Sequence, residues 1–526
     1  MLDVKIEGGT IFDGGGGESV RADVGVRGDR IAAVGPLAAA PARRTIRAAG
    51  RAVAPGFVDV HSHSDAYLLI EPAAPSKLYQ GVTTEIVGNC GASAAPLRGD
   101  YRMPSDWSDK EYPAAWRSVA EYRTLLEAVR PAPNVALLIG HNTLRAGIMG
   151  YGNRPASPAE AAAMAAALER ALEEGGIGLS SGLIYAPGLF AGREELIALA
   201  AVAARHGGIY ASHMRNEASG LLAAVDEALA IGRAAGIRVQ ISHLKAAGRA
   251  NWGLLDGALA RLREARDRGE PVAVDRYPYL AGATDLDVVF PDWAAEGGRE
   301  AVLARLGDRA VRARLYRDLC ASRPAEEWAA VTIGSTTHPD NARFRGMRLT
   351  DVAERLGVDP AEAILRLVER DRATTGAFFA GLSEENMLRV LAEPYAMIGS
   401  DASLRAPTGP LSRDHPHPRA YGAFARVLRM ARDGRPVHLA EAIRKMTALP
   451  AAHFRLRDRG RIREGAYADV VVFDPDAVRD EATYGDPHRL AAGMEWVLVN
   501  GTVTLAAGCL TGDRAGRFLD RGDGGG

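Results

Sequence analysis

The chain has 526 residues, enough for one large domain and a smaller one, because single hydrophobic cores stop growing at about 250–300 residues. Its 64 lysine and arginine residues nearly balance its 65 aspartate and glutamate residues, and no long basic run is present, which argues against nucleic acid as a partner. The chain start lacks a signal-peptide pattern and no run of ~18 apolar residues occurs, so we expect a cytoplasmic protein that does not enter membranes.

Both ends of the chain carry short stretches in which apolar and polar residues alternate, as in half-buried strands. Val4-Lys5-Ile6 is one example near the start, and Trp496-Val497-Leu498-Val499 is one near the end. We predict that residues 1–54 and 451–515 pair into one small β-sandwich domain. A glycine-rich tail at 516–526 is predicted to be flexible.

Between the two ends, strand-like apolar runs alternate with helical stretches rich in alanine, leucine, arginine and glutamate. This alternation is typical of repeated βα units around a buried parallel sheet. The predicted strands are Gly56–His63, Thr84–Asn89, Val135–Gly140, Gly178–Ser181, Ile209–His213, Val239–His243, Val272–Tyr277 and Ala396–Asp401. Eight such units predict a (β/α)8 TIM barrel over residues 55–450, with its active site at the C-terminal strand ends. The long separation of the last two strands predicts an inserted lid or subdomain at about 284–390.

The ends of these predicted strands carry residue types that bind zinc. His61 and His63 are two residues apart on one strand, so both side chains point to the same face. The complete set is His61, His63, Cys90, His213, His243 and Asp401. A filled barrel needs none of these residues for packing alone, so their position at one rim predicts a metal site.

Each of these residues also has a plainer interpretation. Single histidines usually pack or cap, and we assign that role to those outside the strand ends, namely His206, His338, His438, His453 and His488. Cys90, flanked by Gly88 and Gly91, would alone be a buried thiol. Asp401 is a metal ligand, a general base or a helix cap. Three widely spaced cysteines suit a reducing compartment better than disulfides.

The chain resembles the D-aminoacylase (N-acyl-D-amino-acid deacylase) family of the amidohydrolase superfamily. The match runs from the first predicted strand almost to the end of the chain, and the cysteine motif and the His-Pro-His-Pro-Arg run are its most specific parts. The matching segments are Pro55–His63, Gly88–Gly91, Ser212–Arg215, Ser242–Lys245, Tyr277–Tyr279, Gly399–Asp401, His415–Arg419 and Val499–Gly501.

The resemblance implies a zinc enzyme. Cys90, His213 and His243 would hold one tightly bound zinc ion. His61 and His63, together with Cys90 and Asp401, would form a second, weaker site. Hydantoinases and dihydroorotase use a carboxylated lysine as the bridge instead, and the cysteine argues against those relatives.

Metal-assisted amide hydrolysis fits this set of residues, because zinc activates a water molecule and polarises the acyl carbonyl. Asp401 would take the proton from the water and pass it to the leaving amine. Tyr185, just after the fourth predicted strand, is a candidate donor to the oxyanion, although a packing tyrosine explains it equally well.

An N-acyl amino acid carries an α-carboxylate that the site must hold. By the resemblance, Lys245, Tyr277 and Arg419 would contact it, while exposed charges beside a cleft are the alternative interpretation. Thr284 would replace a contact that relatives make through a serine. The loop from 402 to 414 is longer than usual, which would alter access to the pocket.

Relatives specific for N-acyl-D-glutamate carry an additional arginine where this chain has Leu286–Trp293. We therefore expect N-acyl-D-amino acids with neutral or apolar side chains as the small-molecule substrates. D stereochemistry follows from the resemblance alone. Two alternatives stay open: a metal-dependent D-dipeptidase or cyclic amidohydrolase, and a barrel that binds metal or ligand without turnover.

Overall fold

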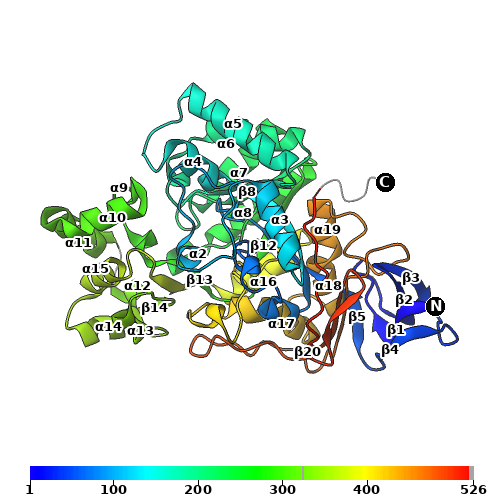
Figure 1. Cartoon of the computed structure of the whole chain (residues 1–526). Helices are drawn as coiled ribbons and strands as arrows, with labels where there is room; N and C mark the ends of the chain where they lie inside the picture. The colour runs from blue at the N-terminus through cyan, green and yellow to red at the C-terminus, as the bar shows by residue number, and fades with distance from the viewer. Residues whose placement is uncertain (323–324, 521–526) are drawn as a thin grey trace.

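The computed structural model describes residues 1–322 and 325–520. Its centre is an eight-stranded parallel sheet in sequence order from the first strand to the last (Figure 1). The strands are β6 (Phe57–Asp59), β7 (Val82–Val87), β8 (Asn134–Gly140), β9 (Gly178–Gly182), β10 (Ile209–His213), β11 (Arg238–Ile241), β12 (Val272–Arg276) and β16 (Ala396–Ile398). A parallel bridge between Ser62 and Ala402 brings the two edges of this sheet together. The predicted (β/α)8 barrel is confirmed.

The barrel strands are buried on both faces. In β8, Leu137 and Ile139 pack toward the surrounding helices, whereas Ala136 and Leu138 face the barrel interior. The covering helices are α1 (Pro75–Leu78), α2 (Ser105–Ser108), α3 (Val119–Val129), α4 (His141–Met149), α5 (Pro158–Glu173), α6 (Arg193–Arg205), α7 (Leu221–Ala235), α8 (Leu254–Asp267), α16 (Glu384–Ala392), α17 (Arg419–Arg432), α18 (Leu439–Met446) and α19 (Ala448–Phe454). None of the helices in the described part of the chain is both long enough and apolar enough to cross a lipid bilayer.

The two chain ends share one mixed sheet of nine strands, seen beside the barrel in Figure 1. Its strands are β1 (Leu2–Ile11), β2 (Val20–Arg27), β3 (Arg30–Gly35), β4 (Ala42–Arg47), β5 (Ala52–Pro55), β17 (Val470–Phe473), β18 (Met494–Val499), β19 (Thr502–Ala506) and β20 (Cys509–Leu510). In β17, Val470 and Val472 pack into the sheet's own core, while Val471 and Phe473 pack against the barrel side. Because alternate side chains of β17 point to opposite faces, this one strand packs against both the core of the small domain and the barrel side.

A separate lobe lies between β12 and α16. It contains an antiparallel sheet in the order β13 (Ala281–Asp285), β15 (Gly376–Ala380), β14 (Val331–Ile333). Its helices are α9 (Asp292–Ala295), α10 (Gly298–Gly307), α11 (Arg309–Ser322), α12 (Ala325–Ala329), α13 (Pro339–Ala342), α14 (Leu349–Leu356) and α15 (Pro360–Arg370). The buried residues of this lobe, from Leu286 to Ala377, form a core of their own. Helix α16 instead packs against β12 and β16, so the lobe ends earlier than residue 390.

Residues 516–520 differ from the predicted flexible tail. Val135 donates its backbone N–H to Arg517 O at 2.9 Å, and Leu519 donates to Val135 O at 2.7 Å. Phe518 is only 2% exposed and packs edge-on against Tyr122. Phe518 and Leu519 lie among polar and glycine residues in the sequence, so no local pattern predicted that they would be buried. Their side chains pack where β8 begins. Residues 521–526 of the predicted tail lie outside the described residues.

Replacing Phe518 with alanine should lower the free energy of unfolding by about 3–5 kcal/mol, because a buried aromatic ring is removed from a packed site. Urea denaturation followed by circular dichroism measures this difference. Val20→Ala, at a residue that is 57% exposed, is the control and should change stability by less than about 0.5 kcal/mol. Equal stabilities of the two variants would contradict the docking of the C-terminal segment.

Candidate metal centre and active site

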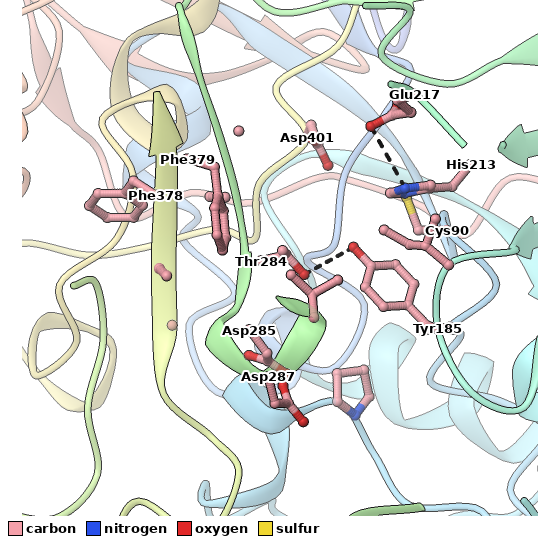
Figure 2. A pocket seen from close by; sticks show the side chains of 18 of the residues that line it. Cys90, Tyr185, His213, Glu217, Thr284, Asp285, Asp287, Phe378, Phe379 and Asp401 are labelled. Carbon is pink, nitrogen blue, oxygen red and sulfur yellow. Dashed lines mark hydrogen bonds and ion pairs between the residues drawn. The ribbon is translucent and has the colours of Figure 1, made fainter. Parts of the chain in front are cut away.

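The structure gathers the six predicted metal-type residues at the C-terminal rim of the barrel. They come from the ends of five strands: His61 and His63 follow β6, Cys90 follows β7, His213 and His243 lie at the ends of β10 and β11, and Asp401 follows β16. All except His63 are under 10% exposed, and all except the fully buried His61 line a single cavity of about 2150 Å³ (Figure 2). The predicted packing histidines His206, His338, His438, His453 and His488 do not line it.

Three of these residues have a left-handed backbone, which is uncommon outside glycine. The φ angles are 53° at Cys90, 37° at His243 and 51° at Asp401. Such conformations cost on the order of 1–3 kcal/mol each and persist only where the surroundings impose them. Asp401 N–H donates to His61 O at 2.7 Å, and His243 N–H donates to a carboxylate oxygen of Asp275 at 3.0 Å. Strain is thus concentrated where side chains turn into the cavity.

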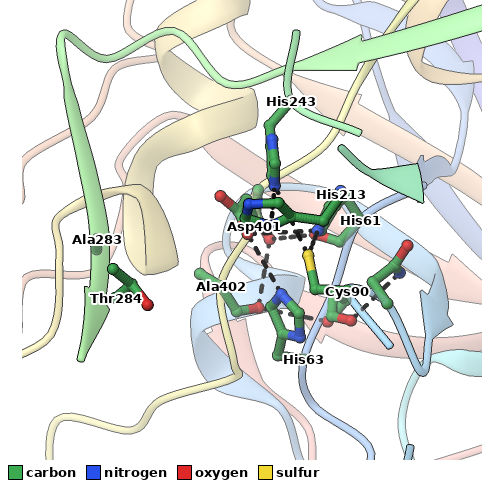
Figure 3. Close-up of polar contacts among 12 residues, drawn as sticks. His61, His63, Cys90, His213, His243, Ala283, Thr284, Asp401 and Ala402 are labelled. Carbon is green, nitrogen blue, oxygen red and sulfur yellow. Dashed lines mark hydrogen bonds and ion pairs between the residues drawn. The ribbon is translucent and has the colours of Figure 1, made fainter. Parts of the chain in front are cut away.

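The first group of potential ligand atoms comes from His61, Cys90, His243 and Asp401, within 4.8 Å of one another. His61 Nε2 lies 3.2 Å from Cys90 Sγ and 3.3 Å from Asp401 Oδ1. His63 Nε2 lies 3.2 Å from the same Asp401 oxygen (Figure 3). One thiol, several imidazoles and a carboxylate converge, as in mixed zinc sites.

The second group of potential ligand atoms comes from His213, Glu217 and His243, and it adjoins the first. His213 Nδ1 lies 3.0 Å from His243 Nε2, and His243 Nε2 lies 3.6 Å from Cys90 Sγ. His243 therefore faces both groups. Two neighbouring clusters of metal-type side chains thus share His243.

Local charge favours the ligand forms of the thiol and the carboxyl group. Burial by itself raises the pKa of Cys90, but His61 and His213 beside it hold that pKa well below its ordinary value. Burial also raises the pKa of Asp401, and the opposing effect of Arg419 and His243 holds it well below the usual range. Both groups are therefore anions suited to a cation.

Two buried carboxylates orient the histidines, and sequence reasoning missed both. Asp275, inside β12, lies 3.2 Å from His61 Nδ1 and accepts a hydrogen bond from Gln240. Glu217 Oε1 lies 2.8 Å from His243 Nδ1. Carboxylates behind ligating histidines are common in metal sites. The only sequence signal for Glu217 is its position four residues after His213.

A buried ion cluster lies beneath the first ligands and was also missed. Lys77 Nζ donates to Asp59 Oδ2 at 2.8 Å and lies 3.2 Å from Glu85. Asp59 Oδ1 accepts from Ser400 N–H at 2.9 Å and from His61 N–H at 3.2 Å. This cluster ties β6 to the segment that carries Asp401.

The residues predicted to hold a substrate carboxylate lie together on one side of the cavity. Arg419 Nη1 is 2.6 Å from Asp401 Oδ2, and its guanidinium carbon is 4.6 Å from the centre of the Tyr277 ring. Within the described residues, the buried Arg419 Nε and Tyr277 Oη have no hydrogen-bond partner. Lys245 Nζ is already held by Glu217 at 2.6 Å. Unused buried donors are costly and mark a place for an acceptor.

His417 positions Arg419 and gives a role to the His-Pro-His-Pro-Arg run. Arg419 donates its backbone N–H to His417 Nδ1 at 3.0 Å, so this nitrogen carries no proton. The other ring nitrogen, Nε2, lies 3.1 Å from Tyr484 Oη. A residue from the C-terminal part of the chain thereby fixes the start of α17.

Tyr185 and Thr284 reach each other from opposite sides of the cavity. Their hydroxyl oxygens are 3.0 Å apart, and the Tyr185 ring packs edge-on against His213 (Figure 2). Asn142 donates to Tyr185 O at 3.1 Å and fixes its loop. Thr284 belongs to β13 of the inserted lobe, so its hydroxyl meets Tyr185 instead of standing free for a carboxylate.

The comparisons with known proteins agree with this architecture. The sequence model of the Amidohydrolase family matches residues 44–505. The chain belongs to this amidohydrolase family. An N-acyl-D-glutamate deacylase of Alcaligenes xylosoxydans xylosoxydans is 40% identical over 522 residues, covering 99% of this chain and 97% of the relative. A D-aminoacylase of the same organism is 38% identical, covering 99% and 98%.

A solved structure shares the whole architecture. The N-acyl-D-glutamate deacylase of Bordetella bronchiseptica, complexed with zinc and a phosphonate inhibitor that mimics the tetrahedral intermediate, is 38% identical with a TM-score of 0.85. The similarity covers 99% of each chain. These comparisons confirm the resemblance to the D-aminoacylase family that the sequence motifs indicated. The similarity extends over the whole chain.

Replacing Cys90 with alanine should weaken zinc binding by more than about 100-fold, because the thiolate that both histidine groups face is lost. Titration of Zn²⁺ into metal-free protein, followed by calorimetry, measures this loss. Cys509→Ala, at an exposed thiol, is the matched control and should bind zinc as the parent does. Undiminished binding by the Cys90 variant would exclude the cysteine as a ligand.

Proposed function

We propose that this amidohydrolase is a zinc-dependent deacylase that hydrolyses N-acyl-D-amino acids to a D-amino acid and a carboxylate. One observation carries the proposal: the unused buried donors of Arg419 and Tyr277 lie beside the cluster of metal-type side chains. A substrate with both an amide and a neighbouring carboxylate satisfies the two features at once. The relatives named for D-amino acid deacylation support the D configuration.

The proposed residues divide the chemistry between them. Zinc bound by Cys90, His213 and His243 would polarise the acyl carbonyl and lower the pKa of a bound water. Asp401 takes a proton from the attacking water and delivers it to the leaving nitrogen, a role that suits a carboxylate held as an anion. His61 and His63 hold Asp401 in place and would complete a second, weaker metal site.

Substrate positioning uses the cationic side of the cavity. Arg419 and Tyr277 receive the α-carboxylate, and Lys245 contributes a nearby positive charge. Burial raises the pKa of Tyr277, yet Lys245 and its arginine neighbours lower it below the ordinary value, which indicates a positive potential at the phenol. Tyr185 donates a hydrogen bond to the developing oxyanion, and Thr284 orients that hydroxyl.

The wall opposite the metal-type residues supports a neutral or apolar substrate side chain. Phe378 and Phe379 line the cavity there, and so do Asp285 and Asp287 (Figure 2). Burial raises the pKa of Asp287 to about 6, against the opposing effect of Arg299. Above pH 6 this wall therefore repels an acidic side chain.

We also propose that the enzyme works in the cytoplasm on small molecules, without nucleic acid or membrane partners. The three cysteines are free thiols, as expected in a reducing compartment. Near-equal numbers of acidic and basic residues give no charge excess for binding phosphates or lipid surfaces.

Amine release from N-acetyl-D-methionine and N-acetyl-L-methionine tests the function, with zinc content measured on the same sample. We expect release from the D form only, and faster than from N-acetyl-D-glutamate. Faster turnover of the glutamate substrate would refute the neutral preference. Zinc-loaded protein that is inactive on all three would refute the deacylase, and D-dipeptides and hydantoins would then be compared; a hydantoin offers Arg419 no free carboxylate.

The variant Asp401→Asn should retain zinc and lose about 10²–10⁴-fold in kcat, because the amide is isosteric but cannot carry the proton. Activity on N-acetyl-D-methionine and zinc per chain are the two measurements. Asp414→Asn, on the loop at the cavity edge, is the control and should keep most activity. Full activity of Asp401→Asn would remove Asp401 from the mechanism.

A further inference from the structure

A single carboxylate lies behind two of the histidines in the cluster. Glu217 follows β10 on the loop that leads to α7, and its side chain is only 12% exposed. Its Oε1 is 2.8 Å from His243 Nδ1, and its Oε2 is 4.0 Å from His213 Nε2. Figure 2 shows this carboxylate above His213, on the side away from Tyr185.

The two ring nitrogens that face Glu217 are opposite those that face the other ligand atoms. His213 Nδ1 and His243 Nε2 lie 3.0 Å apart, and the latter lies near Cys90 Sγ. An imidazole binds a metal through its unprotonated nitrogen, so the proton must then be on the other nitrogen. Both of these N–H groups would point at Glu217, which as a carboxylate only accepts.

The surroundings of His213 indicate which acceptor its Nε2 would use. Its Nε2 is buried and, within the described part of the chain, has no hydrogen-bond partner. A Glu217 carboxylate oxygen lies 4.0 Å from this nitrogen. A residue without an acceptor oxygen at position 217 would remove the acceptor that this nitrogen faces.

Glu217 also restrains a cation. Lys245 Nζ lies 2.6 Å from Glu217 Oε1, 2.8 Å from His243 Nδ1 and 3.1 Å from His243 O. The ammonium group therefore already lies against the His243 nitrogen that would carry the proton, and the Glu217 oxygen that contacts both groups offsets their repulsion. Two donors in contact repel each other, and the positive charge would also oppose a metal ion on the far side of the ring.

We propose that Glu217 is a positioning residue that fixes which nitrogens of His213 and His243 bind the metal and holds Lys245 toward the substrate carboxylate. This inference rests on the proposed deacylase function for the role of Lys245, but not for the role of the histidines. One side chain then couples metal retention to substrate binding, and the two effects are separable by experiment.

Zinc loss to an excess of chelator measures the first effect without any substrate. Glu217→Ala should release zinc about 10–100-fold faster than the parent, which is the usual cost of losing a carboxylate partner behind a ligand. Glu217→Gln retains one acceptor oxygen and should fall between the two. Asp226→Asn, which removes an exposed carboxylate on α7 that pairs with Arg261 of α8, is the matched control and should release zinc at the parent rate.

A double variant separates the two roles of Glu217. Lys245→Met should keep zinc as the parent does and raise KM for N-acetyl-D-methionine. If Glu217 orients the histidines directly, Glu217→Ala/Lys245→Met still releases zinc quickly. If Glu217 serves only to neutralise the ammonium, the double variant retains zinc like the parent, and the assignment of the histidine nitrogens is overturned.

The remaining outcomes also support or overturn the proposed role of Glu217. Zinc release by Glu217→Ala at the parent rate overturns the proposal outright. Equal thermal melting of the metal-free Glu217→Ala and Asp226→Asn proteins shows that fast release is not a folding defect, and if Glu217→Ala melts early, Glu217→Gln takes its place. Fast zinc release together with no deacylase activity in the parent would refute the proposed function while leaving the role of Glu217 intact.

Discussion

Closure of the barrel between β6 and β16 is the constraint on which the site depends. His61 and Asp401 come from the first and last barrel strands, and Asp401 N–H donates to His61 O across the seam. Beneath it, Asp59 accepts hydrogen bonds from both sides and is neutralised by the fully buried Lys77. Removing one member of a buried ion pair costs about 3–5 kcal/mol, because the other charge is left without compensation. This cluster therefore holds the two halves of the metal-binding rim in register.

Charge pairing inside the cavity holds its cationic side chains in place. Arg419 faces Asp401, and Lys245 faces Glu217, so each cation has an anion within 3 Å. These pairs fix side chains before a substrate arrives, and such preorganisation reduces the entropy that binding must overcome. Among the described residues, Arg419 Nε and Tyr277 Oη remain without a hydrogen-bond partner in this arrangement, as does His213 Nε2.

The sequence identified the strand-end residues because a simple rule places them. An apolar run followed by a histidine, cysteine or aspartate puts that side chain at the barrel rim, whatever the helices do. Asp275 and Lys77 were not predicted because no local sequence pattern indicates their role. Asp275 lies inside a strand, and Lys77 lies in a four-residue helix. Their importance arises only when distant segments meet. Phe518 was missed for the same reason, since its binding site is made by β8 and Tyr122.

The inserted lobe contributes walls to the cavity but none of the six metal-type residues at the barrel rim. Thr284, Asp287, Phe378 and Phe379 come from it, whereas His61 through His243 and Asp401 all come from the barrel. The lobe also has a separate core, so its packing does not depend on the rim. Substitutions in the lobe can therefore alter which molecules fit the cavity while the six metal-type residues of the barrel stay in place, with Thr284, which contacts Tyr185, as the exception to be kept. For engineering, the lobe is therefore the segment to exchange with that of a relative.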